Sequence, residues 1–294
     1  MAKKKKKNGH VAIPFLLAFL LGIVCIGGVA AFIFSKISDK EELRPMASSI
    51  VKPTEADNMT LLFVLDEPDG TCPVTILVAR VLPSDKKMML VSLPSNMLAA
   101  VDGKQQSLSQ FYRSGGISML ERAIESEAGI TADRYIILGS EGFQKICNIY
   151  AGVYYTVPTG LKGFTDSSDP QYLGPGQIEK LLTYPAYERG ESERSTKTAD
   201  LLCDMINQTD YERIAASMDS NFKILVNMMD TDITSIDYGD HKEALKYMYK
   251  YGNKICTFRI AVGTDTEDGY FILGSSFKDT VADYFTDAPA AEGE

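Results

Sequence analysis

The longest uncharged run of the chain lies near its start and differs from every later segment. Residues 11–34 are 24 residues without a charge, and five consecutive lysines precede them at positions 3–7. A helix of this length, at about 1.5 Å per residue, exceeds the roughly 30 Å hydrocarbon core of a bilayer. A cleaved signal peptide has a shorter apolar region, of roughly 7–15 residues, so the run predicts an uncleaved transmembrane anchor. The small residues at 27–31 keep signal cleavage open as the alternative.

The predicted anchor divides the chain into five segments. Lysines beside a span stay on the cytoplasmic side, so residues 1–10 are expected to be a cytoplasmic basic tail and 11–34 a single membrane span. Residues 35–59 are polar, which predicts a stalk. Residues 60–285 are the predicted extracytoplasmic domain, and 286–294 are a predicted disordered tail. We therefore expect the protein in the cell membrane, with its main domain outside.

Beyond residue 60, apolar residues follow strand and helix periods in alternation. Short apolar runs bounded by turn signals predict strands at 61–65, 75–81, 88–93, 135–138, 153–157, 255–260 and 269–272. Helical spacing of apolar residues predicts helices at 118–128, 140–148, 177–182, 195–207, 209–227 and 276–285. Ser140 is the expected N-cap of the second of these helices. Interleaved strands and helices predict an α/β fold, a layered domain with a central mixed β-sheet flanked by helices.

Charge narrows the range of partners. The chain has 30 basic and 39 acidic residues, and five of the basic ones are the lysines at 3–7, so the remainder has 25 basic against 39 acidic residues and a net charge of −14. An acidic domain repels polyanions, so nucleic acid is not an expected partner. The lysine run beside the span is interpreted as a topology signal that also contacts anionic lipid.

Cysteine and histidine content argues against two kinds of site. The chain has five cysteines and two histidines, His10 and His241. It contains no Cys-x-x-Cys motif and no Cys/His cluster, so a zinc site of the usual kind is not expected. A Ser-His-Asp triad could use only His241, which lies in an acidic, helix-like surface segment. Cys25 lies in the predicted span. The other four are free thiols or form two disulfides in one of three pairings: Cys72, Cys147, Cys203 and Cys256.

Three longer stretches can be compared as motifs. They are TILVARVLPSDKKMMLVSLPSN at 75–96, FYRSGGISMLERAIESEAGITADRYIILGSEGFQKICNIYAGVYYTVP at 111–158, and NMMDTDITSIDYGDHKEALKYM at 227–248. Their order, together with the single N-terminal span, resembles the LytR-CpsA-Psr (LCP) family over about residues 60–285. The resemblance implies a membrane-anchored extracytoplasmic phosphotransferase, which moves a glycopolymer from a polyprenyl-pyrophosphate carrier to peptidoglycan. It also implies a lipid pocket between sheet and helices, arginines that bind pyrophosphate, and acidic residues that hold a divalent metal such as Mg²⁺.

The chain departs from the family's pattern where that chemistry is expected. Asp66 keeps the acid at the end of the first strand, which makes it the candidate catalytic residue and metal ligand. Cys72 and Val74 stand where the family has an Arg and an Asp. Ser95 and Asn96 stand where its Pro-Arg-Asp turn has the Arg and the Asp. The resemblance therefore implies a degenerate site that has lost two arginines and two acids.

Three later cations are the candidates for binding pyrophosphate. Arg194 and Lys197 are three residues apart on the first turn of a predicted helix, so they share a face, and the helix N-terminus favours an anion. Arg194 is also a candidate catalytic residue, and Arg189 is a displaced counterpart of the family's paired arginines. Arg113 is a further possible substitute. The alternative for these cations is ion pairing with acidic neighbours, which are Glu188, Glu191 and Glu193.

Three functions are therefore carried forward. The first is a divergent LCP protein of the cell envelope that binds a polyprenyl-linked glycopolymer or another lipid, with weak or no transferase activity. The second is an active transferase, with a rebuilt site, that attaches a glycopolymer to peptidoglycan. The third is a non-catalytic scaffold that acts through protein partners. Loss of charged donors argues against the second, because one deleted donor in a preorganised site costs roughly 10²–10³ in rate.

Overall fold

A computed structural model describes residues 52–66 and 74–285, without the side chains of residues 282 and 283. The predicted cytoplasmic tail, the predicted span, most of the predicted stalk, Cys72 and the predicted C-terminal tail lie outside the described residues. Among the residues that are described, no helix combines the length and the apolar character needed to cross a membrane. A short 3₁₀ helix, η1 (Glu55–Asp57), and the first strand begin within the predicted stalk.

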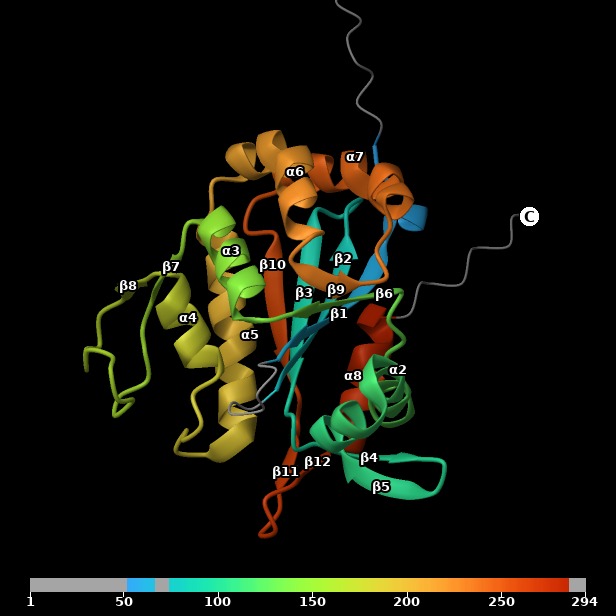
Figure 1. The fold of residues 1–294 in the computed structure, drawn as a ribbon, viewed down its shortest axis with the longest axis vertical. Coiled ribbons are helices and arrows are strands. Elements are labelled where there is room, and N and C mark those ends of the chain that lie inside the picture. Colours follow the sequence, from blue (N-terminus) through green and yellow to red (C-terminus); the bar gives the residue numbers. More distant parts are fainter. Residues whose placement is uncertain (1–51, 67–73, 286–294) are drawn as a thin grey trace, which may run out of the picture. The chain divides into compact units, whose positions relative to one another are not determined.

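A six-stranded mixed sheet forms the centre of the domain, in the order β10-β3-β2-β1-β6-β9 (Figure 1). Its strands are β1 (Met59–Leu65), β2 (Thr75–Leu82), β3 (Lys87–Leu93), β6 (Arg134–Leu138), β9 (Met229–Thr231) and β10 (Cys256–Ile260). β2 is antiparallel to β1 and β3, whereas β6 is parallel to β1 and β10 is parallel to β3. β1, β3, β6 and β10 therefore end at the same side of the sheet, which we call the carboxyl edge.

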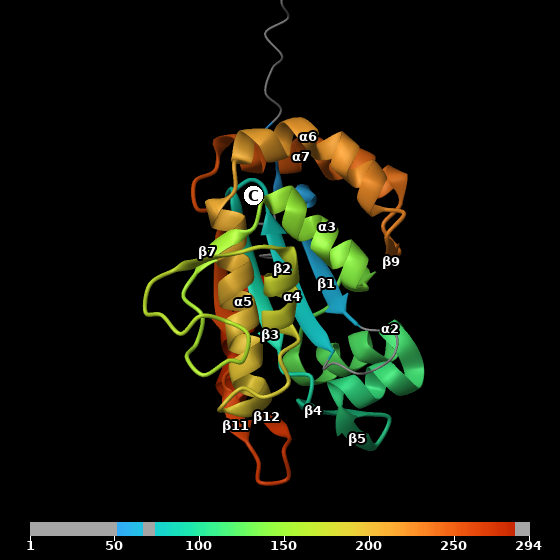
Figure 2. The same ribbon diagram turned by 60° about the vertical axis from the view of Figure 1, so that its left-hand side comes forward.

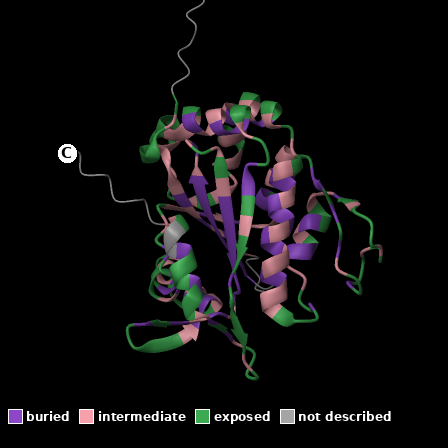
Figure 3. Ribbon diagram, turned by 180° about the vertical axis from the view of Figure 1, so that it is seen from behind, coloured by how far each residue is buried: buried purple, intermediate pink, exposed green. Residues whose placement is uncertain are grey.

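Helices cover both faces of this sheet, so the central strands are buried on both sides (Figure 3). One face packs against α3 (Ser140–Tyr150), α4 (Pro175–Leu182), α5 (Gly190–Gln208), α6 (Tyr211–Leu225) and α7 (Ser235–Tyr251) (Figure 2). The other face packs against α2 (Leu108–Ala128) and α8 (Ser275–Phe285). Burial on both faces explains the near-continuous apolar runs of β2 and β3. The predicted layered α/β domain with a mixed sheet is confirmed.

Three two-stranded ribbons complete the fold. They are β4 (Leu98–Val101) with β5 (Lys104–Ser107), β7 (Val153–Tyr155) with β8 (Gln171–Leu173), and β11 (Gly263–Asp265) with β12 (Phe271–Leu273). The β4–β5 ribbon was not predicted, because β5 is a polar strand without an apolar alternation. β8 lies between the predicted strand 153–157 and the predicted helix 177–182, where no strand was predicted.

One predicted helix start and one predicted N-cap are wrong. α2 begins at Leu108 instead of residue 118, because the Ser107 hydroxyl accepts the Gln110 N–H and caps the helix early. Its regular geometry then breaks at Gly116, whose φ of 67° interrupts the helix and separates the predicted part from the earlier turns. The N-cap of α3 is Gly139, not Ser140, which is the first helical residue.

Candidate functional site

The carboxyl edge gathers residues from several elements that are distant in sequence. Asp66 directly follows β1, Val74 and Thr75 open β2, and Ser95 lies in the turn after β3. The Ser95 carbonyl accepts the N–H of Ser109 at 2.9 Å, which fixes the start of α2 beside this turn. In open α/β sheets, ligands bind outside the carboxyl ends of the strands, so this edge is the candidate functional site.

Asp66 is held by a two-pronged ion pair with Arg113 on α2. The Arg113 Nη2 lies 2.6 Å from Asp66 Oδ1, and its Nη1 lies 2.8 Å from Oδ2. The Asp66 side chain is 13% exposed and that of Arg113 is 40% exposed. Burial and the negative charge of Asp66 together raise the pKa of the neighbouring Tyr112. The retained acid is therefore an ion-pair partner within this fold.

Arg194 is buried at the same edge, and the protein uses all of its donors. Its Nε and Nη2 bind the carboxylate of Glu191, with 2.7 Å between Nε and Oε2. Its Nη1 donates to the Thr75 hydroxyl at 2.7 Å and also to the Leu182 carbonyl, and its Nη2 donates to the Val74 carbonyl at 2.9 Å. Because a guanidinium has five N–H donors, an anion could bind Arg194 only by displacing one of these partners.

Glu191 connects this arginine to the turn after β3. Its Oε1 accepts the backbone N–H of Ser95 at 2.9 Å, in addition to the bonds from Arg194. Glu193 lies in the same first turn of α5 and accepts the backbone N–H of Arg189 at 2.9 Å. The positive end of the α5 dipole therefore already has two carboxylates beside it.

The other two predicted cations lie elsewhere on α5. Arg189 is exposed at the N-cap position of the helix. The Lys197 Nζ lies 3.8 Å from Asp200 Oδ2, and its side chain is about a third exposed. Of the three predicted pyrophosphate-binding residues, Arg194 alone contacts the strand ends through hydrogen bonds. The pairing of Arg194 with Glu191 is the alternative that the sequence analysis left open.

The positions that depart from the family's pattern have structural contacts. Val74 and Ser95 are buried, with 3% and 7% of their surface exposed. The Asn96 Nδ2 donates to the Gly269 carbonyl at 2.8 Å, and the Asn96 carbonyl accepts the N–H of Phe271 at 3.2 Å. Asn96 thereby joins the β3 turn to the connection between β11 and β12.

The donor set that residues 52–66 and 74–285 present at the edge does not suit a magnesium ion. Mg²⁺ prefers near-octahedral oxygen ligands, usually one or two carboxylates with water and phosphate oxygens. Both oxygens of Asp66 accept hydrogen bonds from Arg113, and Val74 has no side-chain oxygen. Residues 52–66 and 74–285 contain no group of three or more His, Cys, Asp or Glu side chains arranged to hold a metal.

An apolar groove lies on the sheet face covered by α3 to α7, between the starts of β1 and β6 and the helices α3, α6 and α7. Its volume is about 280 Å³. It is lined chiefly by Met59, Leu61, Ile136, Ile146, Ile149, Ile214, Met218, Leu225, Ile233 and Leu245. Leu61 and Asp66 are five residues apart on β1, so roughly 17 Å separates the groove from the carboxyl edge along this strand.

The groove has few polar groups on its wall. Arg134 and Asp237 form an ion pair at 2.6 Å, and Arg134 holds the pKa of the Asp237 carboxyl below its usual value. His241 also lines the groove, and its buried Nδ1 has no hydrogen-bond partner within the described chain.

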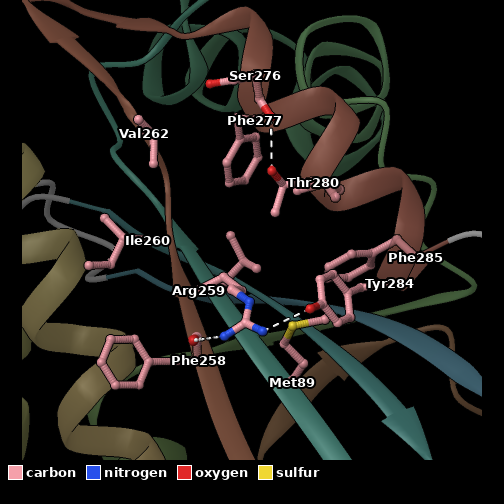
Figure 4. A pocket seen from close by; sticks show the side chains of 12 residues that line it. Met89, Phe258, Arg259, Ile260, Val262, Ser276, Phe277, Thr280, Tyr284 and Phe285 are labelled. Atoms are coloured by element: carbon pink, nitrogen blue, oxygen red, sulfur yellow. Dashed lines mark hydrogen bonds between the residues drawn. The ribbon is translucent and has the colours of Figure 1, made fainter.

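A larger cavity, of about 380 Å³, lies between β3, β10 and α8 (Figure 4). Arg259 crosses it and donates a hydrogen bond to the Tyr284 hydroxyl at 2.9 Å, with its guanidinium carbon 4.9 Å from the centre of that ring. Arg259 is the single charged residue in its lining. Neither Asp66 nor Arg194 lines this cavity, so we place no chemistry in it.

The three cysteines that the structure describes are buried free thiols: Cys147, Cys203 and Cys256. Burial raises the pKa of Cys147 to about 12. Asn207 binds both the N–H and the carbonyl of Cys256, at 2.9 and 2.8 Å. Of the alternatives in the sequence analysis, the structure agrees with free thiols at these three positions.

Comparison with known proteins identifies the fold and its relatives. The LytR_cpsA_psr family description matches residues 72–282. The teichoic acid transferase TagU of Enterococcus faecalis, named as acting between polyisoprenyl-teichoic acid and peptidoglycan, is 24% identical over 80% of this chain and 84% of its own. A structure solved as a transcription regulator of Eubacterium siraeum superposes with a TM-score of 0.69, at 18% identity, over 83% of this chain and 98% of that one. Bacillus subtilis TagV superposes at 0.60, with 16% identity, over 79% and 98%. The chain belongs to the LytR-CpsA-Psr family.

Proposed function

We propose that this protein acts in cell-wall assembly by binding a polyprenyl-(pyro)phosphate-linked glycopolymer, and that it transfers the polymer weakly or not at all. The observation that carries the proposal is the apolar groove beneath α6 and α7, on the same sheet face that leads to the carboxyl edge. Ligand grooves of this kind are apolar with a few polar groups on the wall. An isoprenoid chain suits the apolar lining, and its phosphate would lie toward the carboxyl edge.

The charges at the carboxyl edge support low transferase activity. Phosphoryl transfer depends on positioned positive charge that neutralises the phosphate oxygens. Here Asp66 pairs with Arg113 and Glu191 pairs with Arg194, so these four side chains have no net charge. Arg194 is also buried, with 3% of its surface exposed. A second pyrophosphate-binding cation and an acidic metal site are the parts that transfer would need.

The proposed setting is the outer face of the cell membrane. In this proposal residues 11–34 anchor the chain, and the domain binds a carrier that is itself held in the membrane. Peptidoglycan is the proposed neighbour on the acceptor side, because the name of the TagU relative places teichoic acid transfer there. The relatives' names also favour an active transferase as the second candidate function.

A tryptophan substitution inside the groove tests the proposal. The probe is geranylgeranyl pyrophosphate, added to the full-length chain in detergent, with binding measured by calorimetry. Leu225→Trp fills the groove and should abolish saturable binding, whereas Ile224→Trp on the adjacent, 43% exposed position of α6 should leave it unchanged. Equal binding by both variants would place the ligand elsewhere. Labelled glycan on peptidoglycan with wild type, lost in Asp66→Ala, would establish the active transferase instead.

A further inference from the structure

The ion pair between Asp66 and Arg113 occupies the place at which a divalent cation is implied. We infer that the Arg113 guanidinium supplies the positive charge of this site and binds the carrier's phosphate directly, so that binding needs no metal ion. The inference rests on the proposed function, because it names the group that contacts the phosphate of that ligand. It starts from the donor set described above, in which Arg113 holds both oxygens of Asp66, at 2.6 and 2.8 Å.

Arg113 retains the capacity to bind an anion while it holds Asp66. The ion pair uses two of the five N–H donors of the guanidinium, one on each Nη atom. The other three have no partner within residues 52–66 and 74–285. The Arg113 side chain is 40% exposed and that of Asp66 is 13% exposed, so the accessible part of the pair is the arginine. A planar guanidinium is always charged and binds phosphate oxygens in pairs.

The fold holds Arg113 in position before any ligand arrives. Phe111 is 1% exposed in the core, and the Ser109 N–H binds the Ser95 carbonyl at 2.9 Å, so the first turns of α2 are fixed on both sides. Gly116 then ends this segment, and its φ of 67° lets the rest of α2 take another direction. Asp66 acts as a positioning residue that fixes the plane of the guanidinium at the end of β1.

The other cations are less able to take this role. Arg194 is 3% exposed, and its five donors are bonded to Glu191, Thr75 and backbone carbonyls. Lys197 lies 3.8 Å from Asp200, further along α5. A guanidinium in place of a metal ion needs no further acidic ligands. This agrees with Val74 and Asn96, which stand where the resemblance implies aspartates.

The test separates the pyrophosphate from the lipid part of the ligand, and Mg²⁺ from the Arg113 guanidinium. Full-length protein is titrated with geranylgeranyl pyrophosphate in Mg²⁺ and in excess EDTA, and with geranylgeraniol, which lacks the phosphates. Wild type should bind the pyrophosphate with a Kd that agrees within about twofold in the two buffers. Arg113→Gln should weaken this binding roughly 10- to 100-fold, because it removes a charged hydrogen-bond donor, and should leave geranylgeraniol unchanged.

Arg122→Gln is the matched control, since Arg122 lies on the same helix in a similar pair with Asp102, at 2.7 Å. It should bind both ligands as wild type does. The inference is overturned if pyrophosphate binding tightens tenfold or more with Mg²⁺, or if it survives Arg113→Gln. In either case, binding of geranylgeraniol would still support the groove as the lipid site. Failure of wild type to bind either molecule overturns both.

Discussion

Removal of the Arg194 side chain distinguishes a structural residue from a ligand-binding one. Arg194→Gln leaves the Glu191 carboxylate, 14% exposed, without its cation, and it leaves the Thr75 hydroxyl and the carbonyls of Val74 and Leu182 with fewer donors. Breaking a buried ion pair by removal of one partner costs about 3–5 kcal/mol. For a domain of this size, that corresponds to a fall in Tm of roughly 6–20 °C.

Urea unfolding followed by far-ultraviolet circular dichroism measures this loss, since the chain has no tryptophan for a fluorescence signal. Lys197→Gln is the control on the same helix, and loss of its partly exposed pair should change the free energy of unfolding by less than about 1 kcal/mol. Glu191→Gln and the double variant complete a cycle, with an expected coupling energy of at least about 1 kcal/mol. An Arg194→Gln protein that unfolds within about 1 kcal/mol of wild type, yet loses ligand binding, would refute the structural role.

Three further predictions concern the core. Because burial raises the pKa of Cys147 to about 12, above roughly 8.5 in an unfolded chain, its contribution to stability is complete below about pH 8.5 and is lost as the pH rises toward 12. When the free energy of unfolding is measured as a function of pH, it should fall more steeply at alkaline pH for wild type than for the Cys147→Ala control. Asn207→Ala removes both hydrogen bonds to Cys256 and should lower the free energy of unfolding, measured in urea, by about 1–3 kcal/mol. A change below about 0.5 kcal/mol, on the order of measurement error, would contradict this expectation. Gly142→Ala should destabilise by about 1–3 kcal/mol, because its Cβ would lie 2.7 Å from the Met228 carbonyl oxygen; an unchanged thermal midpoint would contradict this.

The parts of the fold that could be predicted are those whose signal is local. β2 and β3 are buried on both faces, so their apolar runs indicated strands at nearly the observed bounds. The β4–β5 ribbon has a polar second strand, and the early turns of α2 depend on a cap at Ser107, so neither has a strong apolar period. Local periodicity therefore found the layers but missed the connections that position Arg113.

The site was predictable in its residue types and not in its pairings. Asp66, Ser95 and Arg194 were singled out as candidate or altered site positions from the resemblance. Glu191 lies three residues from Arg194 and was named beforehand as a possible partner, but the partners of Asp66 and Ser95 lie far away in the chain: 47 residues separate Asp66 from Arg113, and 96 separate Ser95 from Glu191. No spacing rule connects such pairs, because the packing of α2 and α5 on the sheet decides them. The acidic neighbours of Arg194, which are Glu188, Glu191 and Glu193, indicated the local pair alone.

The two ion pairs at the carboxyl edge have different consequences because their burial differs. Around the Arg194 guanidinium, water is excluded and every donor is occupied, so its charge serves the junction between β2 and α5. The Arg113 side chain is 40% exposed and only two of its donors hold Asp66, so the same kind of pair leaves donors for a ligand. A phosphate that arrives there would compete with water and not with the fold. Ligand binding and stability should therefore separate between the two arginines, with Arg113→Gln lowering affinity and Arg194→Gln lowering the free energy of unfolding.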